Sequence, residues 1–469
     1  MELNWVTPKI IIDILDANSY QKKYIQNLII LNQCGLELKK LFTLCEDIYR
    51  GNTPKHVEGS LQNGALLLKT VNIRSNELDL GKQFSMTNSV YFEQKRFQLK
   101  ENDICITIMG ATHDIIGRSW VYNKKIGNAC FSDGIAKIKN VVIDPYYLST
   151  YLNSKYGHLS IIQFSGSSTR SYITNTQLGE ILVPIPSPEI QKYVGDKVRK
   201  AEELREEAKR LKKEAEEVLN NELNVKELLI KIDRYTEKHS WIMNSDINDR
   251  MDALYYNPQK ITIKKFYKNY NLQKLKDLVD YKKGYAFKSE DYCNNTSTFL
   301  LRVSDISNNE VDMCNMLNLP DEFYQEYKDF NLINGDIVMV VTGNTTGKSI
   351  VINNNKFKLL LNQNAIRMRI KEGIDISPYY IELILQSQYF QTLLKYSLYQ
   401  SVQPFISMEF LNDVVIPIID KTKIENISNL YEKSLNNLFY AKQLIQEAKQ
   451  DVEDLIEGNF DMSKVKANS

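Results

Sequence analysis

The sequence predicts an α+β protein built as a tandem duplication of two globular domains, each followed by a long helix. Six segments of the first half recur, in the same order, in the second half. Two stretches, residues 189–223 and 424–455, carry a heptad pattern, which indicates that the two long helices pair with each other. Within each half, short β-rich runs are separated by Gly, Asn and Asp loops, as in small mixed domains.

The duplication is visible as matched segments that lie about 233 to 236 residues apart. The pairs are Trp5 and Asp16 with Trp241 and Asp252, KKLFTL (39–44) with QKLKDL (273–278), ALLLKTVNIRSNELD (65–79) with TFLLRVSDISNNEVD (298–312), YFEQKRFQLKENDI (91–104) with YQEYKDFNLINGDI (324–337), DPYYLSTYLNS (144–154) with SPYYIELILQS (377–387), and LVPIP (182–186) with VIPII (415–419). Chance does not produce six matches in one order, so we interpret the second half as a copy of the first.

The two heptad stretches predict an intramolecular coiled coil, because apolar or small residues alternate in steps of three and four. The predicted seam residues are Val198, Ala201, Leu204, Ala208, Leu211, Ala215 and Val218 in the first helix, and Ile427, Tyr431, Leu438, Ala441, Ile445, Ala448 and Val452 in the second. At about 1.5 Å per residue, the first helix would be roughly 50 Å long. Two independent amphipathic surface helices are the alternative, but one strand of a coiled coil needs a partner and the chain supplies it.

These patterns divide the chain into five segments. We predict a first domain over residues 1–188, a central helix over 189–236, a second domain over 237–420, a C-terminal helix over 421–458 and a loose tail over 459–469. Gly458 is a suitable residue to end the last helix. Pro145 and Pro378 suit the first turn of a shorter helix in each domain.

Composition narrows the class of protein. The chain has 469 residues, 43% hydrophobic content and a net charge of +1, so it can form more than one core and is not strongly basic. Its six cysteines lie far apart without a CxxC motif or a nearby histidine, which argues against zinc and for reduced thiols. No signal peptide or membrane span is predicted, and we expect a cytoplasmic protein.

Three stretches resemble catalytic motifs but lack a required residue. GNTTGKS (343–349) has three residues between its glycines where a phosphate-binding loop needs four, and DPYY (144–147) lacks the second proline of the amino-methyltransferase tetrapeptide. PDEFYQEYK (320–328) resembles a nuclease motif, but Asn88 replaces its acid in the first copy, and a catalytic metal needs both carboxylates. We therefore expect a chain that is not an enzyme and has no cofactor of its own.

The remaining signal is nucleic-acid recognition. Each half carries three polar loops whose side chains can form hydrogen bonds with phosphates and base edges. The predicted DNA-binding residues are Lys69, Asn72, Arg74, Thr112, Arg118, Ser168, Thr169 and Arg170 in the first half, and Arg302, Asn344, Thr345, Thr346, Lys348, Gln400, Ser401 and Gln403 in the second. The matched segments repeat while the loop residues differ, as expected for two related domains that recognise two different targets.

The whole chain resembles the specificity subunit of type I restriction–modification enzymes. The resemblance rests on three stretches: RMDALYYNP (250–258), NGDIVMVVTGNTTGKSIV with LNQNAIRMR (361–369), and STRSYITNTQLGEILVPIPSPEIQKYV (168–194). The first half departs from the family pattern, since ENDI replaces GDI at 101–104 and ILDANSY is a less typical domain start.

The resemblance implies two target-recognition domains on an antiparallel pair of helices, each reading one half of a bipartite double-stranded DNA site. It also implies two modification subunits that bind S-adenosylmethionine and methylate adenine. Restriction subunits that use ATP and cut DNA in phage defence are implied as well. A recognition subunit of a methylation-only system and a coiled-coil scaffold that does not read DNA are the alternatives. DNA retention separates the scaffold from the other two.

Overall fold

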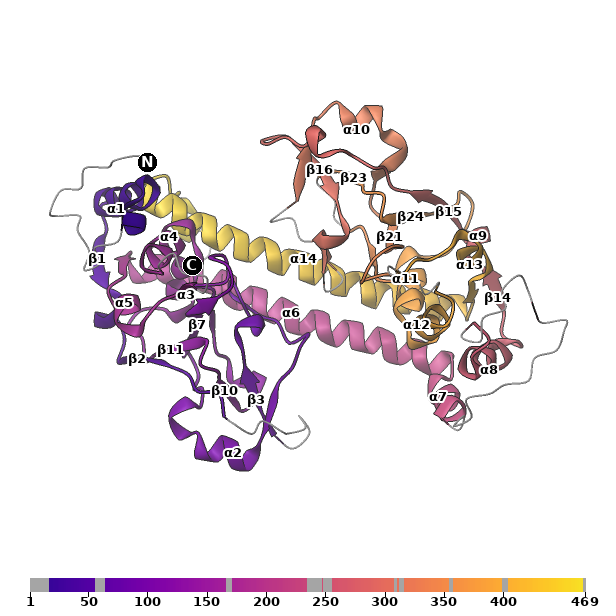
Figure 1. Ribbon diagram of the computed structural model, residues 1–469, viewed down its shortest axis with the longest axis horizontal. Coiled ribbons are helices and arrows are strands. Elements are labelled where there is room, and N and C mark those ends of the chain that lie inside the picture. The colour runs from indigo at the N-terminus through magenta and orange to yellow at the C-terminus, as the bar shows by residue number, and fades with distance from the viewer. Residues whose placement is uncertain are drawn as a thin grey trace. The chain divides into compact units, whose positions relative to one another are not determined.

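The computed structural model describes residues 17–54, 64–165, 171–233, 247, 255–307, 310–311, 316–353, 357–398 and 404–466. The chain forms two compact units, unit 1 (Met1–Leu204 with Tyr440–Ser469) and unit 2 (Arg205–Phe439) (Figure 1). Each unit contains one of the predicted domains and part of each long helix. No helix within the described residues is long and apolar enough to cross a membrane.

Unit 1 combines short strands with helices, as predicted. Its strands are β1 (Glu37–Lys40), β2 (Asp47–Arg50), β3 (Gly64–Leu68), β4 (Ile73–Arg74), β5 (Glu77–Leu78), β6 (Ser85–Thr87), β7 (Ile104–Thr107), β8 (Met109–Gly110), β9 (Ser119–Val121), β10 (Ala129–Phe131), β11 (Ile135–Lys139), β12 (Ser171–Tyr172) and β13 (Leu182–Ile185). Its helices are α1 (Lys22–Gln33), α2 (Asn88–Glu93), α3 (Pro145–Asn153), α4 (Lys155–Phe164), α5 (Asn175–Gly179), α15 (Ser463–Lys466) and its parts of α6 (Pro188–Glu222) and α14 (Lys421–Glu457).

Unit 2 repeats this order of elements. Its strands are β14 (Leu272–Lys274), β15 (Val279–Lys283), β16 (Thr298–Leu301), β17 (Ile306–Ser307), β18 (Glu310–Val311), β19 (Leu317–Leu319), β20 (Asn331–Leu332), β21 (Ile337–Val340), β22 (Ser349–Val351), β23 (Lys358–Leu361), β24 (Ala365–Ile370) and β25 (Val415–Pro417). Its helices are α7 (Val225–Asp233), α8 (Pro258–Tyr267), α9 (Leu275–Leu278), α10 (Phe323–Glu326), α11 (Pro378–Gln386), α12 (Gln388–Lys395), α13 (Met408–Asp413) and the remaining parts of α6 and α14.

Strand order confirms the tandem duplication. The main antiparallel sheet has the order β2-β11-β7-β9 in unit 1 and β15-β24-β21-β22 in unit 2. A second sheet joins matched strands in parallel, β3 with β10 and β16 with β23. The central strands ICIT and IVMV are buried at every position, because they lie between a second sheet and the helices and expose neither face.

The start of the short helix is confirmed in both copies. Pro145 and Pro378 occupy the first turns of α3 and α11, where a missing N–H is tolerated. Asp144 accepts hydrogen bonds from the N–H groups of Tyr146 and Tyr147 at 2.9 and 3.0 Å, and so caps α3. The DPYY segment is therefore a helix start.

Most residues of the predicted seam of the long helices are buried. Val198, Ala201, Ala208, Leu211, Ala215, Ile427, Tyr431, Ala441, Ile445, Ala448 and Val452 are buried, and Leu204, Val218 and Leu438 are partly buried. After Ala215, the fully buried positions are Leu219 and Leu223, each four residues further along. A straight α-helix has 3.6 residues per turn, so its buried face drifts from a strict heptad within two turns.

Contacts within each unit show that the helices are antiparallel. In unit 2, the Ser434 hydroxyl donates to the Ala208 carbonyl at 2.7 Å, whereas Lys423 pairs with Glu222, further along α6, at 3.3 Å. In unit 1, the Lys197 ammonium pairs with Asp451 at 2.5 Å. As residue numbers rise along α6, those of the partners on α14 fall.

Two boundaries differ from the prediction. The central helix expected over residues 189–236 is interrupted, because α6 ends at Glu222 and Asn224, with φ of 51°, turns the chain into α7. Gly458 ends α14 with φ of 79°, as predicted. The tail is not loose up to residue 466, because Phe460 packs on Tyr193 with ring centroids 6.1 Å apart and Lys464 pairs with Asp451 at 2.9 Å. The boundary expected near residues 236–241 lies outside the described residues.

Candidate nucleic-acid interface

The first predicted loop forms the same tight turn in both copies. In unit 1, the Lys69 N–H donates to the Asn72 side-chain oxygen at 2.9 Å, and in unit 2 the Arg302 N–H donates to Asp305 at 2.9 Å. The side chain of the fourth residue therefore fixes the turn that follows the parallel strand. The Arg302 guanidinium adds a bidentate pair with Asp305, at 3.0 and 2.8 Å.

The structure contradicts the prediction that Asn72 binds DNA. Its side chain is 1% exposed, and its amide donates to the carbonyls of Asp79 and Lys82 at 2.8 and 2.7 Å. A buried amide with both hydrogen-bonding ends occupied cannot contact DNA, so Asn72 positions the loop. Lys69 lies on the rim of this turn, with its ammonium 3.9 Å from the centre of the Phe84 ring.

The structure brings two predicted loops of unit 1 together. The Asn76 N–H donates to the Ser119 carbonyl at 2.9 Å, which places the β4–β5 hairpin beside the loop that ends at Arg118. Burial and the neighbouring charge of Arg74 lower the pKa of Arg118. Its guanidinium is held by Asp114 at 2.7 Å, while Thr112 at the loop tip is exposed.

The matched loop of unit 2 is more open. Asn344 and Lys348 are exposed, and the Thr346 hydroxyl donates to the carbonyls of Gly343 and Pro404 at 2.6 and 3.1 Å. The Thr345 hydroxyl is buried without a hydrogen-bond partner among the described residues. These residues line a cavity of about 470 Å³ that Ile306, of the first loop, also lines. In unit 2 the second loop therefore lies beside Ile306, an apolar residue of the first loop.

The third predicted loop contains Ser168, Thr169 and Arg170 in the first copy and Gln400, Ser401 and Gln403 in the second, and all six lie outside the described residues. Its flank is described in both units. β12 pairs with β8 through Tyr172 and Met109, and Phe405 forms the matched bridge to Thr342. In each copy the chain thus leaves the third loop beside the second one.

Sequence reasoning missed an exposed aromatic at this junction. Tyr172 is 56% exposed and Phe405, 233 residues later, is 39% exposed. Exposed aromatic rings beside polar loops can stack on bases or sugars. The sequence could have indicated this pair, because Tyr172 and Phe405 each stand directly before an isoleucine that the two copies share.

A basic residue beside Gly51 was also missed. Arg50 precedes Gly51, and its guanidinium donates to the Asp133 carbonyl at 2.7 Å and to the Met109 sulfur at 3.4 Å. A Cβ at Gly51 would lie 2.3 Å from a carbonyl oxygen, so only glycine allows this approach. Lys283 and Gly284 repeat the pair in unit 2, which the matched sequences could have indicated.

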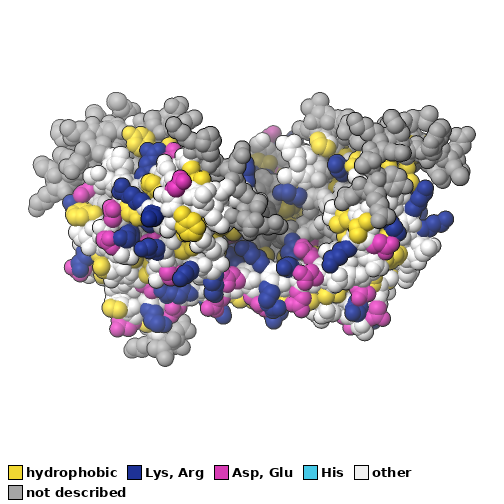
Figure 2. Space-filling view, turned by 90° about the horizontal axis from the view of Figure 1, so that it is seen from below, with side chains coloured by type: hydrophobic (Ala, Val, Ile, Leu, Met, Phe, Trp, Pro, Cys, Tyr) yellow, Lys and Arg dark blue, Asp and Glu magenta, His cyan; other side chains and the backbone are white. Residues whose placement is uncertain are grey.

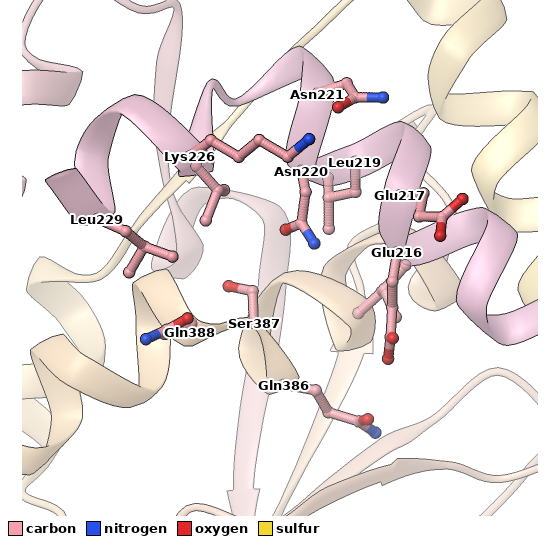
Figure 3. Close-up of a pocket in the computed structure, with 12 residues that line it drawn as sticks. Glu216, Glu217, Leu219, Asn220, Asn221, Lys226, Leu229, Gln386, Ser387 and Gln388 are labelled. Carbon is pink, nitrogen blue, oxygen red and sulfur yellow. The ribbon is translucent and has the colours of Figure 1, made fainter. Parts of the chain in front are cut away.

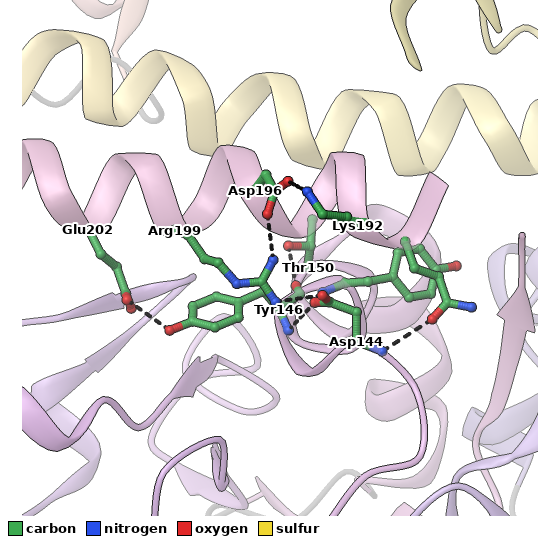
Figure 4. Close-up of polar contacts among 9 residues, drawn as sticks. Asp144, Tyr146, Thr150, Lys192, Asp196, Arg199 and Glu202 are labelled. Carbon is green, nitrogen blue, oxygen red and sulfur yellow. Dashed lines mark hydrogen bonds and ion pairs between the residues drawn. The ribbon is translucent and has the colours of Figure 1, made fainter. Parts of the chain in front are cut away.

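Each domain is fixed to a long helix by a tyrosine at the start of its short helix. In unit 1, the Tyr146 hydroxyl donates to Glu202 at 3.0 Å, and Arg199 pairs with Asp144 at 2.5 Å (Figure 4). The Trp120 indole N–H also donates to Glu202, at 3.2 Å. In unit 2, the matched Tyr379 donates to Glu432 of α14 at 3.3 Å. The loops are thus carried on domains docked to the helix that follows them in the sequence.

The arrangement contains polar loops and no assembled catalytic group within the described residues. No cluster of three His, Cys, Asp or Glu there could hold a metal ion. Burial raises the pKa of the Cys130 thiol to about 12 and lowers that of His158 to about 4, so near neutral pH the thiol stays protonated and the imidazole stays uncharged. Asp321, of the nuclease-like stretch, accepts hydrogen bonds from Ser297 and Thr298 and so links the chain after β19 to the start of β16.

Comparison with known proteins identifies the family. The type I restriction modification DNA specificity domain matches residues 47–217 and 267–442, more than half of the chain. The chain therefore belongs to the family of type I restriction–modification specificity subunits, and the resemblance inferred from its sequence is confirmed.

Two curated relatives agree with this assignment. The Escherichia coli EcoBI type I restriction enzyme specificity subunit is 28% identical over 31% of this chain and 29% of its own length. The Methanocaldococcus jannaschii MjaVIII specificity subunit is 25% identical over 40% of this chain and 45% of its own length. The chain thus aligns with less than half of either relative. The crystal structure of a type-I restriction-modification system S subunit from M. genitalium covers 91% of this chain and 97% of its own, at 11% identity and a TM-score of 0.43.

Proposed function

We propose that this chain is the non-catalytic DNA-recognition subunit of a type I restriction–modification complex and reads a bipartite double-stranded DNA site. The observation that carries the proposal is that two copies of one domain fold carry polar loops of different sequence. The duplicated fold provides two DNA-recognition domains, and the different loop residues give the two domains different target sequences. The site is then asymmetric, with one half assigned to each unit.

In this proposal the catalytic chemistry belongs to partner subunits in the cytoplasm. Two modification subunits bind S-adenosylmethionine and methylate adenine, which they must turn out of the duplex. Restriction subunits use ATP and cut DNA. Lys and Arg side chains are interspersed with Asp and Glu on the face in Figure 2, so we expect partners to supply part of the phosphate neutralisation.

We further propose that the two long helices set the length of the unread spacer. α6 has 35 residues and α14 has 37. At about 1.5 Å per residue such helices are roughly 50 Å long, more than the ~34 Å between half-sites one DNA turn apart. Changing the helix length by whole turns should therefore change the spacer and leave both half-sites unchanged.

Genome-wide adenine methylation tests the proposal directly. Deleting this gene from the host should abolish methylation of one asymmetric two-part motif. Replacing the loops of unit 2 with those of a related chain should then change one half-site only. If deletion and replacement change no methylated motif, and the reconstituted complex does not retain DNA, the chain is a scaffold.

Lys348 provides a residue-level prediction. It is exposed on the β21–β22 loop, and no described residue forms an ion pair with it. If it contacts a phosphate, Lys348→Ala should weaken DNA binding by the reconstituted complex by about 1 kcal/mol, roughly fivefold, and reduce the salt dependence by about one ion. Lys265→Ala, an exposed lysine on α8, is the matched control and should leave both quantities unchanged. Equal affinities for the two variants would remove Lys348 from the interface.

A further inference from the structure

The chain makes the same close backbone contact after β2 in unit 1 and after β15 in unit 2. The N–H groups of Gly51 and Gly284 donate to the first residues of β11 and β24 at 2.9 and 3.0 Å. The next N–H groups, of Asn52 and Tyr285, donate to the last residues of β10 and β23 at 3.2 and 2.9 Å. Asn52 and Tyr285 are therefore held at matched positions by the same backbone hydrogen bonds.

The side chains at this matched position differ in kind. In unit 1, the exposed Asn52 amide donates to the side-chain oxygen of Gln94, at the end of α2, at 3.0 Å. In unit 2, the Tyr285 ring is 39% exposed, and its centroid lies 4.8 Å from that of Tyr327 and 5.2 Å from that of Phe330. Tyr327 ends α10 and stands 233 residues after Gln94. A pair of amides in one copy thus replaces a pair of aromatic rings in the other.

The amide pair of unit 1 keeps hydrogen-bonding groups for a ligand. Asn52 uses one N–H and Gln94 one oxygen lone pair for their mutual bond, and neither side chain forms another hydrogen bond with a described residue. Each amide therefore retains at least one N–H and one acceptor lone pair. In the major groove of DNA, a side-chain amide pairs in this way with the N6 amino group and N7 of adenine.

A series of contacts joins the amide pair to the candidate interface. Thr53, the residue after Asn52, donates to the Asp133 carboxylate at 2.7 Å. The Arg50 guanidinium donates to the Asp133 carbonyl at 2.7 Å and to the Met109 sulfur at 3.4 Å. Met109 is the strand partner of Tyr172, beside the second and third loops. Because Arg50, Thr53 and Asp133 are all exposed, one polar surface continues from these loops to the end of α2.

Basic side chains lie beside the amide pair. Lys95 and Arg96 follow Gln94 directly, both are exposed, and neither forms an ion pair with a described residue. The Arg96 guanidinium lies over the Tyr49 ring of β2, 5.0 Å from its centre. Exposed basic side chains without an acidic partner suit contacts to backbone phosphates, which position a duplex while neighbouring groups contact the bases.

We propose that the residue after this glycine recognises one base pair in each half of the DNA site. In unit 1, Asn52 and Gln94 form hydrogen bonds with the major-groove edge of an adenine. In unit 2, Tyr285, held by Tyr327, packs against the methyl group of a thymine. The inference rests on the DNA-recognition function proposed above, and it adds a position that the three polar loops of each unit do not contain.

The test measures the affinity of the complex, reconstituted with its modification subunits, for duplexes that carry the methylated motif or one base-pair replacement in it. Asn52→Ala should lose discrimination of about fivefold or more at one A·T pair of one half-site and keep it elsewhere. Asn52→Asp should prefer C·G at that pair, because a carboxylate only accepts hydrogen bonds and cytosine offers its N4 amino group. Asn32→Ala is the matched control, on α1 at the opposite end of unit 1 from α2 (Figure 1), and should bind every duplex as the parent does.

Tyr285→Ala should relax one T·A pair in the other half-site only. Its control is Asn220→Ala, because Asn220 is exposed on α6 in a cavity of about 570 Å³ whose lining contains no residue of the polar loops (Figure 3). That control should leave discrimination at every pair unchanged.

The outcomes separate this inference from the function on which it rests. If the parent discriminates among the duplexes and Asn52→Ala and Asn52→Asp discriminate equally at every pair, the inference is wrong and the DNA-recognition function stands. A loss spread evenly over both half-sites also contradicts the inference, since it indicates a phosphate contact or a general loss of structure. A parent complex that binds all duplexes equally would overturn both.

Discussion

Leu211→Asp should destabilise unit 2 by about 4 kcal/mol, since it removes a buried leucine and places an unpaired charge between two helices. Leu211 is 3% exposed, and it lies one turn from Ala208, whose carbonyl binds Ser434 of α14. Domains are typically stable by only 5 to 15 kcal/mol, so this is a large share. Hydrogen exchange along α6 and α14 should accelerate in unit 2.

Lys213→Asp is the matched control for that variant. It places the same side chain on the same helix, at a position whose side chain is 77% exposed and whose partner is a surface glutamate. Its effect on the unfolding free energy should stay below about 1 kcal/mol. If Leu211→Asp exchanges no faster than Lys213→Asp, the helix pair contributes little to unit 2.

Glu382→Gln should make the stability of unit 2 less sensitive to pH. Glu382 lies on α11, fully buried, with the Ser349 hydroxyl 3.3 Å from one carboxylate oxygen and the Gln386 amide bonded to the same oxygen. The other oxygen has no hydrogen-bond partner among the described residues. Burial raises the pKa of this carboxyl from 4.5 to about 7, partly offset by hydrogen bonds from Tyr431 and Gln386.

The sign of the effect follows from proton binding. The folded state holds this proton more tightly than the unfolded state, so the stabilisation is complete below pH 4.5 and is lost by about pH 7. Glutamine cannot ionise. The unfolding free energy of Glu382→Gln, relative to that of the parent, should therefore rise by roughly 2 to 3 kcal/mol between pH 5 and pH 8.

Urea unfolding at several pH values, with hydrogen exchange of residues 378–398 to report on unit 2, measures this difference. Glu372→Gln, at an exposed glutamate of the same unit, is the matched control. Its difference from the parent should be nearly constant over this pH range. A Glu382→Gln protein that shows the same constant difference would mean that Glu382 stays ionised in the folded state.

The duplication and the helix pair could be predicted from the sequence, because both appear there as a regular spacing of similar residues. The duplication is found by comparing the two halves of the sequence, because one offset matches six segments. The heptad pattern identifies the helix face that is buried. Register drift beyond Ala215 could not be predicted, since Val218 and Leu219 are both apolar. Only the packing of the folded chain selects Leu219 as the fully buried residue.

The candidate interface was harder to predict, because residue type does not reveal which way a side chain points. Asn72 and Asn344 are both asparagines in polar loops, yet the first is buried under its own turn and the second is exposed. Arg118 and Lys348 occupy matched positions, but only Arg118 has an aspartate four residues earlier to hold it. Comparing the two copies residue by residue exposes such differences, whereas reading either copy alone does not.

The division of the long helices between units has a consequence for synthesis on the ribosome. Unit 2 is one continuous stretch, complete once Phe439 has emerged. Unit 1 begins the chain but keeps Ala441, Ile445, Ala448, Val452 and Ile456 in its core, so the domain translated first is completed last. Until then, the apolar face around Val194 and Val198 is uncovered and open to chaperones. A chain interrupted after residue 439 would thus lack a complete unit 1, although most of unit 1 is made first, and would contain all of unit 2.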